Sequence, residues 1–407
     1  MNFKPLENQP RLLLKATLRP LQGSRFQPTG FPDLGAATYD CPQGRKMLLV
    51  ESAQSMANRF EAVCWDTTEN NWVQPLQGLP AVLVNDKAGN PLTNSVLEAH
   101  RLNSPYITNA KGFDEIKAMI AFDDKRPFNR EPLLKSLLKY DVNALLHGVF
   151  LEKIAGVIRL PRALTGFIEA TDVTTVASGG VKNDRVRAAK GDEGQTAKEG
   201  FGNIPFPRDE YCGHITAFFN LDLALIHGFG LGPDAEALLI ALSLFKIQRF
   251  LRDGLRLRTA CDLEIDGALI VQRPGDFVVP SLKELEDALP ALIAKAYAKT
   301  DGKDRFTTVT YDEAKKKATS LQLSTGPTIP KELENIVKWK KATKKKPASL
   351  EISSENEVSA EELAQQLYPG DDKTNARTAF LKAWQAASSQ GDADEDESAD
   401  DPNQEQK

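Results

Sequence analysis

The stretch RLLLKATLRP, Arg11–Pro20, alternates apolar and polar side chains. Leucine or alanine stands at every even position from Leu12 to Leu18. In a strand successive side chains point to opposite faces of the sheet, so this spacing predicts a half-buried strand with one core face. The opposite face is predicted to be polar and basic. Its residues are Lys15, Thr17 and Arg19.

Outward from this strand, hydrophobic periodicity and helix-ending signals predict the other main elements. A helix is expected at 131–148, with Pro132 in its first turn and Gly148 after its end. The order strand, helix, strand, strand, helix, strand is that of the ferredoxin-like arrangement. We therefore predict an α+β fold, a ferredoxin-like, RRM-type palm (βαββαβ) with large insertions; the alternative is two small α/β domains. The six elements are a strand at 12–19, a helix at 47–65, strands at 162–173 and 215–226, a helix at 234–253 and a strand at 255–265.

Two long segments interrupt this order. Residues 67–130 are rich in Pro, Asn and Gly and carry only short strand-like pieces such as AVLV. Residues 177–214 join two strands over far more chain than a hairpin needs, and loops of that length are usually functional or disordered. The predicted domains are a palm at 1–330 that contains both insertions, a basic and helical C-terminal extension at 331–387 and an acidic, disordered tail at 388–407.

The charge of the chain is unevenly distributed. Its formal net charge is −5, but residues 351–407 hold fifteen acidic and four basic residues, so residues 1–350 carry a net charge of +6. Clustered cations on an otherwise balanced body are typical of a protein that binds a polyanion. The basic clusters lie at 4–25, 182–190, 249–258 and 331–346.

Several other classes of protein are disfavoured by the same sequence. The longest largely apolar run, at 237–245, has nine residues, whereas a membrane-spanning helix needs roughly 20. No apolar segment with a cleavage site opens the chain, so we expect a cytoplasmic protein. Four scattered cysteines favour reduced thiols over disulfides or a zinc site, and the glycine patterns of P-loops and dinucleotide-binding folds are absent. No cofactor and no metal are expected.

Two further stretches are candidates for phosphate contact. In the helix expected at 47–65, Ser52, Ser55 and Arg59 share one flank, where two hydroxyls and a guanidinium suit a phosphate or a sugar. The alternative is a solvated helix flank. In ASGGVKNDRVR, two glycines allow a tight turn before a row of cationic and amide side chains. These are Lys182, Asn183, Arg185 and Arg187.

Catalysis is an alternative to binding. None of the four histidines has a partner at metal-site spacing, but His100 stands in a polar setting and is the candidate acid or base if the chain is a nuclease. Aromatic residues make up 7% of the chain, and the RNP pattern of RNA-binding sheets is missing. If nucleic acid binds, we therefore expect basic loops to hold its backbone, rather than bases to stack on a sheet.

Several long motifs occur in order along residues 11–265. They are RPLQGSRFQPTGFPDLGAATY, LLVESAQSMANR, LEAHRLNSPY, LPRALTGFIEATDV followed by VASGGVKNDRV, and RTACDLE. With these motifs the chain resembles the RAMP-superfamily backbone subunit of the type I-G (formerly I-U) CRISPR Cascade. The resemblance implies a non-catalytic, multi-copy protein that coats the spacer of a CRISPR guide RNA without sequence preference, so that the guide pairs with target DNA.

The resemblance also gives the insertions and one helix a role. It implies that residues 67–130 are finger-like and that residues 177–214 are a thumb by which one copy reaches over the guide onto its neighbour. In related subunits a stretch similar to SSQSxKR contacts guide phosphates. Here SAQSMANR shifts the basic position but keeps the residues Ser52, Gln54, Ser55 and Arg59.

The implied partners are the guide RNA, target DNA through the guide, neighbouring copies of the chain, the large subunit, the fused cap and processing subunit, and the recruited helicase-nuclease. No membrane partner is implied. Two alternatives stay open: a RAMP endoribonuclease that processes precursor CRISPR RNA with His100 or a loop acid, and a protein scaffold without RNA.

The opening basic strand is continued by LQGSRF, whose Gln22, Ser24 and Arg25 suit an RNA backbone without reading its bases. The resulting surface would accept any spacer. The complete predicted RNA-binding set is Lys15, Thr17, Arg19, Gln22, Ser24, Arg25, Ser52, Gln54, Ser55, Arg59, Lys182, Asn183, Arg185 and Arg258.

Overall fold

The structure is a computed structural model of residues 1–407. The chain divides into two compact units, Met1–Tyr311 and Asp312–Lys407, whereas the sequence prediction placed a division at residue 330. The predicted acidic tail at 388–407 lies outside the described residues. The structure describes residues 1–31, 35–122, 125, 128–156, 158–182, 204–298, 305–312, 319–322, 327, 329–333, 336–340, 349–352, 359–369 and 373–384.

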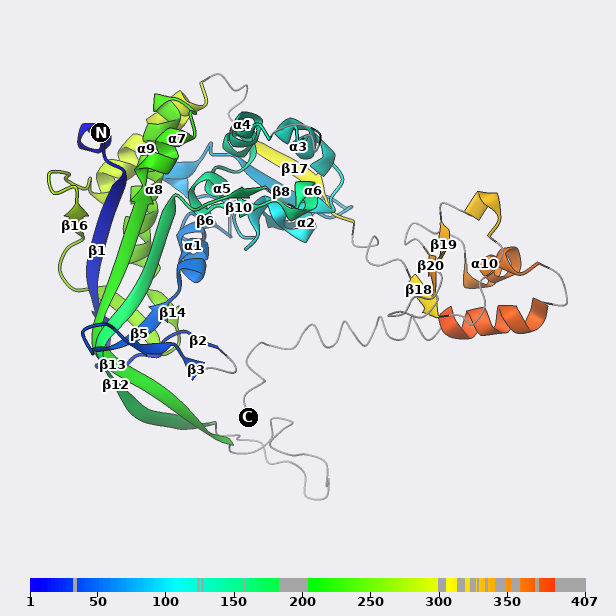
Figure 1. The fold of residues 1–407 in the computed structure, drawn as a ribbon, viewed down its shortest axis with the longest axis horizontal. Helices are drawn as coiled ribbons and strands as arrows, with labels where there is room; N and C mark the ends of the chain where they lie inside the picture. The colour runs from blue at the N-terminus through cyan, green and yellow to red at the C-terminus, as the bar shows by residue number, and fades with distance from the viewer. Residues whose placement is uncertain are drawn as a thin grey trace. The chain divides into compact units, whose positions relative to one another are not determined.

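An eight-stranded antiparallel sheet runs along one side of the first unit (Figure 1). Four of its strands lie in the spatial order β15, β1, β13, β12, and each is antiparallel to its neighbours. β5 and β4 extend the sheet beyond β12, β14 extends it beyond β15, and β16 also pairs with β1. Helices combined with an antiparallel sheet confirm the predicted α+β class. The bounds are β1 Arg11–Pro20, β4 Thr38–Asp40, β5 Lys46–Glu51, β12 Leu164–Lys182, β13 Ile204–Asp222, β14 Arg256–Arg258, β15 Cys261–Ile265 and β16 Ile270–Arg273.

The alternation in β1 separates the two faces of this sheet, as predicted. The even-numbered side chains from Leu12 to Leu18 are buried. Thr17 and Arg19, which alternate with them, are exposed. One face of the sheet is therefore core, and the other carries the polar residues of the opening strand.

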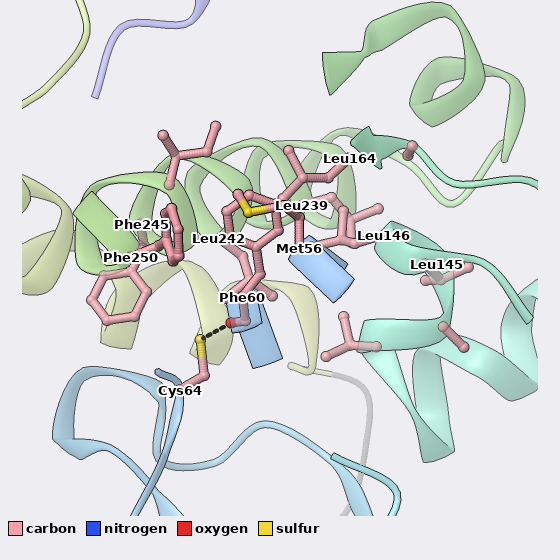
Figure 2. Close-up of a cluster of buried hydrophobic side chains, with 14 of the residues drawn as sticks. Met56, Phe60, Cys64, Leu145, Leu146, Leu164, Leu239, Leu242, Phe245 and Phe250 are labelled. Atoms are coloured by element: carbon pink, nitrogen blue, oxygen red, sulfur yellow. Dashed lines mark hydrogen bonds between the residues drawn. The ribbon is translucent and has the colours of Figure 1, made fainter. Parts of the chain in front are cut away.

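Two helices cover the apolar face. α1 (Ala53–Ala62) and α8 (Pro233–Asp253) contact each other, α1 contacts β12, and α8 contacts β13 and β15. The Phe60 ring lies within this packing, 5.5 Å from the ring of Phe250 and 6.1 Å from that of Phe219 between centroids. Figure 2 shows the cluster of buried apolar side chains around Phe60. The core therefore fixes α1 against the sheet.

The predicted insertion at 67–130 contains short strands and helices of its own. The AVLV segment is a strand, as expected, because β8 (Ala81–Asn85) pairs with β9 (Pro91–Asn94) and, in parallel, with β17 (Phe306–Thr310). The remaining elements of the first unit are η1 Lys4–Leu6, β2 Gly30–Phe31, β3 Gly35–Ala36, β6 Trp65–Asp66, β7 Asn71–Trp72, η2 Gln74–Leu76, η3 Arg101–Asn103, α2 Pro105–Thr108, α3 Phe113–Ile120, α4 Arg130–Tyr140, α5 Val142–His147, β10 Val149–Phe150, α6 Glu152–Ala155, β11 Arg159–Leu160, α7 Leu223–Gly228 and α9 Leu282–Ala296.

The predicted helix at 47–65 is wrong over its first residues. These form strand β5, in which Leu48 and Val50 are buried, and α1 begins only after Ser52. The Ser52 hydroxyl caps the helix by accepting a hydrogen bond from the backbone N–H of Ser55. The apolar residues before it fit a strand as well as a helical stripe, and the N-cap serine is the signal that separates the two.

Three other predicted boundaries also change. Asp141 divides the helix expected at 131–148 into α4 and α5, because its carboxylate accepts the N–H of Ala144 and caps the second helix. The strand expected at 215–226 ends at Asp222, which caps α7 in the same way. Aspartate side chains that bind nearby N–H groups interrupt apolar runs without altering their periodicity. The strand expected at 255–265 is a hairpin of β14 and β15.

Strands β12 and β13 are longer than the predicted strands at 162–173 and 215–226. Their ladder continues past a bulge between Thr171 and Thr174 to the pair Lys182 and Ile204. Part of the predicted insertion at 177–214 is therefore a two-stranded ribbon that continues the main sheet (Figure 1). Residues 183–203 lie outside the described residues.

The second unit has a small core of its own. Its strands form an antiparallel sheet in the order β18, β20, β19, and Leu350 of this sheet is buried together with Leu363 and Phe380. The extension at 331–387 was predicted to be helical, and a helix is present at 374–384, but the strands were not predicted. The elements are β18 Thr319–Gln322, η6 Lys331–Leu333, β19 Val337–Lys340, β20 Ser349–Ile352 and α10 Ala360–Leu367.

Candidate nucleic-acid interface

The sheet face opposite α1 and α8 carries the predicted basic strand residues. Lys15, Thr17 and Arg19 project from β1 on this side, since the residues between them are buried on the other. The Arg19 Nε donates to Glu264 Oε1 at 2.8 Å, and its Nη1 lies 3.7 Å from Asp266 Oδ1. The Arg19 side chain is 60% exposed, so these ion pairs are weak. A phosphate can replace the carboxylates at little cost.

A pair of aromatic rings lies on the same face. Phe218 is opposite Lys15 on β1 and opposite Phe167 on β12, and residues opposite each other in a sheet share a face. The rings of Phe167 and Phe218 stack with centroids 5.2 Å apart and planes 25° apart, and both side chains are half-buried. This pair departs from the sequence expectation, which placed no stacking surface on the sheet. The two phenylalanines stand in separate strands, so only the strand register reveals them.

The loop after β1 lines a small polar cavity. Gln22, Ser24 and Arg25 surround about 340 Å³ together with Glu210 of β13. The Arg25 Nη1 lies 3.3 Å from Glu210 Oε2 and 3.5 Å from the Ser178 hydroxyl. The structure thus brings these three predicted residues together. Their contact with RNA stays a prediction.

The flank of α1 has the predicted arrangement. Ser52, Ser55 and Arg59 are half-buried, whereas Gln54 is exposed. The Ser52 hydroxyl accepts the Ser55 N–H at 3.3 Å, so it satisfies one of the donors that a helix start leaves free. The remaining N–H groups of the first turn lie beside the two hydroxyls.

Arg59 and Arg258 converge on one buried carboxylate. Their Nη2 atoms lie 3.2 Å and 2.5 Å from Oε2 of Glu51, whose side chain is 2% exposed. Arg59 also donates to the backbone oxygen of Leu257 at 2.8 Å, and Arg258 donates to that of Gln27 at 2.9 Å. This cluster joins β5, α1 and β14. Both arginines therefore have a structural role in the isolated chain, and sequence reasoning missed Glu51 because a lone glutamate at a strand end carries no signal.

The predicted residues fall into separate groups. Arg19 lies on the open sheet face, whereas Arg59 belongs to α1 on the covered face, so a nucleic-acid strand that meets both passes around the sheet edge. Lys182 is the last described residue of β12. Asn183 and Arg185 lie outside the described residues.

Two of the four cysteines, Cys64 and Cys261, are buried, and Cys41 and Cys212 are half-buried. All four are free, as expected, and burial raises the pKa of Cys64 and Cys261 to about 11. Within the described residues, no three His, Cys, Asp or Glu side chains form a group that suits a metal ion. None of the helices in that part of the chain is long and apolar enough to span a membrane.

His100, the residue of the catalytic alternative, is exposed and lines a cavity of about 790 Å³. Arg101, Lys153 and Arg159 line the same cavity. Sequence reasoning singled out the histidine but not these cations, because they come from two segments about fifty residues apart that the fold brings together.

Part of the chain is similar in sequence to a family of CRISPR-associated proteins. No curated protein matches the chain. It is similar to a chain of a solved "CRISPR RNA-guided surveillance complex, pre-nicking" at 15% identity, with a TM-score of 0.35, over 63% of this chain and 74% of that one. It is similar to Csc2 of Thermofilum pendens at 11% identity, with a TM-score of 0.26, over 74% and 84%. Residues 12–175 match the family model described as "CRISPR-associated protein GSU0053".

Proposed function

We propose that this chain is a guide-RNA-binding backbone subunit of a type I-G CRISPR Cascade, an antiviral surveillance complex. The match of residues 12–175 to a family of CRISPR-associated proteins carries the proposal. The strand order β15, β1, β13, β12, with α1 and α8 on one face, supports a ferredoxin-like, RRM-type palm. In this proposal the chain coats the spacer as many copies and leaves the bases free to pair with target DNA.

Contacts to the sugar–phosphate backbone fit a subunit that accepts any spacer. Arg19 and Arg25 are exposed, and the carboxylates that pair with them are exposed or partly exposed, so both arginines are available to phosphates. Phosphate contacts position a protein on a strand and carry no sequence information. The stacked pair Phe167 and Phe218 adds a surface that tolerates every base, since each base has a flat face.

The ribbon formed by β12 and β13 supports a thumb that joins neighbouring copies. Its ladder extends beyond the last residue pair between β1 and β13, Leu18 and Ile215, as far as Lys182 and Ile204. In the proposal the ribbon crosses the guide and meets the next copy in a filament. The other proposed partners are the large subunit, the fused cap and processing subunit, and the recruited helicase-nuclease, within a prokaryotic cytoplasm.

Purification from cells that express a CRISPR array tests the proposal. The chain is expected to retain RNA of guide length, with an absorbance ratio at 260 and 280 nm that shows nucleic acid. An absorbance ratio of pure protein under these conditions, with no extractable RNA, contradicts it. That result instead supports the protein scaffold without RNA.

One observation favours a second candidate, a RAMP endoribonuclease. His100 lines a cavity with several cations, and histidine is the side chain that most often serves as a general acid or base. We propose binding without catalysis, so labelled repeat RNA incubated with the chain in the presence of chelator is expected to stay intact. Cleavage that His100→Ala abolishes identifies the enzyme instead.

A further inference from the structure

A cavity of about 790 Å³ lies between the segment 99–105 and the segment 147–162. Neither segment supplied a residue to the predicted RNA-binding set. The volume falls within the range of about 300–1,000 Å³ that is usual for small-ligand sites. The lining residues are Ala99, His100, Arg101, Asn103, Pro105, His147, Gly148, Val149, Phe150, Glu152, Lys153, Arg159, Leu160, Pro161 and Arg162.

The lining is strongly cationic. It contains three arginines and one lysine, and Glu152 is its one acidic residue. Arg101 is neutralised by Glu61, which it holds through two hydrogen bonds of 2.7 Å. Lys153, Arg159 and Arg162 have no comparable carboxylate partner among the described residues. The cavity therefore carries an uncompensated positive charge that suits an anion.

Arg162 is half-buried in the wall of the cavity. Its Nε donates to the His147 backbone oxygen at 3.2 Å and its Nη1 to that of Ala53 at 3.3 Å. Desolvation lowers the pKa of Arg162, and the nearby charge of Arg101 lowers it further. A bound anion opposes the effect of desolvation, so an anion beside Arg162 stabilises its charged form.

His147 lies in the wall of the cavity and is buried. Its Nε2 lies 2.9 Å from the Lys246 Nζ. Desolvation lowers the pKa of His147 well below its usual value, which keeps the ring neutral. The Nδ1 is buried and has no hydrogen-bond partner among the described residues. The ring therefore closes the wall of the cavity, and the charge that faces a ligand comes from the lysine and the arginines of the lining.

A flat surface lies beside the same cations. The Arg159 guanidinium sits over the Phe150 ring, 4.4 Å from its centroid, and Phe150 is 37% exposed. Guanidinium and aromatic planes are the surfaces on which unpaired bases stack. The cavity thus combines an anion site with a place for a planar ring.

We propose that this cavity binds one nucleotide, with its phosphate at the cationic lining around Arg162 and its base on the Arg159–Phe150 layer. The shared chemistry is a phosphate joined to a base, and its source is either a residue of single-stranded RNA or a free mononucleotide. The inference deepens the proposed function and rests on it only for the choice of RNA as the source.

Titration of the chain with three probes tests the pocket. The probes are inorganic phosphate, AMP and a short single-stranded RNA, and the variants are Arg159→Ala, Phe150→Ala and Phe150→Tyr. Arg159→Ala is expected to weaken AMP and RNA binding about tenfold, and Phe150→Ala to do the same, because one stacked base contributes roughly 1–3 kcal/mol. Phe150→Tyr keeps the stack and is expected to bind as the unaltered chain does. Inorganic phosphate is expected to bind equally to the Phe150→Ala variant.

Lys135→Ala and Lys283→Ala are matched controls, since both lysines are exposed and lie outside the cavity lining. They are expected to leave all three affinities unchanged. If Arg159→Ala and Phe150→Ala both leave the AMP and RNA affinities unchanged, the pocket is overturned. If Arg25→Ala weakens RNA binding in the same experiment, the proposed function still stands. AMP binding to the pocket without any RNA binding instead keeps the pocket and overturns the guide role.

Discussion

The guanidinium of Arg258 and that of Arg59 both donate to one oxygen of Glu51, at 2.5 Å and 3.2 Å. Glu51→Gln removes the charge but keeps the shape of the side chain. It leaves two partly buried cations without their carboxylate, so we expect the free energy of unfolding to fall by about 2 kcal/mol. Chemical denaturation followed by circular dichroism measures the change.

The control for this variant is Glu264→Gln, which removes the partner of the exposed Arg19. An exposed ion pair contributes about 0–1 kcal/mol, so little change is expected there. Equal effects of the two variants mean that the Glu51 cluster does not join β5, α1 and β14 in the way its contacts indicate.

Asp141 makes stability depend on pH. Burial, and after it the charge of Glu61, raise the pKa of its carboxyl to about 7 against the opposing charges of Arg101 and Lys246. A carboxyl whose pKa is higher in the folded state contributes stability below its unfolded pKa, near 4, and loses it as the pH rises through about 7. Asp141→Asn keeps the side-chain acceptor that caps α5 and removes the titration.

We therefore expect the difference in unfolding free energy between the Asn variant and the unaltered chain to shift in favour of the variant by about 3 kcal/mol from pH 4 to pH 8. Urea denaturation at several pH values measures it. Because the comparison is a difference between two chains, other titrating groups such as His147 largely cancel. A difference that is constant with pH rules out the raised pKa.

Phe167 and Phe218 stack on the open sheet face. Removing one of these rings is expected to lower the affinity for RNA without changing the charge of the interface. Phe218→Ala is expected to weaken binding of single-stranded RNA about tenfold, since a base that stacks on an aromatic ring contributes roughly 1–3 kcal/mol. The slope of log affinity against log salt is expected to stay the same. Fluorescence anisotropy at several salt concentrations measures both quantities. If the affinity of Phe218→Ala for RNA is unchanged, the sheet face does not contact RNA.

Replacing Arg25 is expected to change the salt dependence of RNA binding, which replacing Phe218 leaves unchanged. If each copy neutralises about four phosphates, the salt slope per copy on single-stranded RNA is roughly −3, and Arg25→Ala is expected to reduce its magnitude by about 0.7. Its effect on affinity is expected to be the same for every RNA sequence, because phosphate contacts are blind to bases. If the effect of Arg25→Ala depends on RNA sequence, or if the salt slope is unchanged, Arg25 does not contact the RNA phosphates.

Local periodicity was sufficient to predict β1, α8 and the order of the main elements. It failed at Ser52, Asp141 and Asp222, where one side chain caps a helix inside an apolar run. Such capping is a local hydrogen bond that the apolar pattern does not record.

The candidate site was predictable only where its residues are neighbours in sequence. The loop of Gln22, Ser24 and Arg25 was found because it is continuous. The pair Phe167 and Phe218, by contrast, depends on the register of β12 with β13, and the nucleotide cavity depends on two segments that only the fold brings together. Register and tertiary proximity are set by the whole core, so a single stretch of sequence does not specify them.

The central claim is that copies of this chain coat a guide RNA. Co-expression with guides of several spacer lengths, followed by native mass spectrometry of the purified complexes, tests it most directly. The account predicts that the number of protein copies rises stepwise as the spacer lengthens. A copy number that stays fixed across all spacer lengths contradicts it.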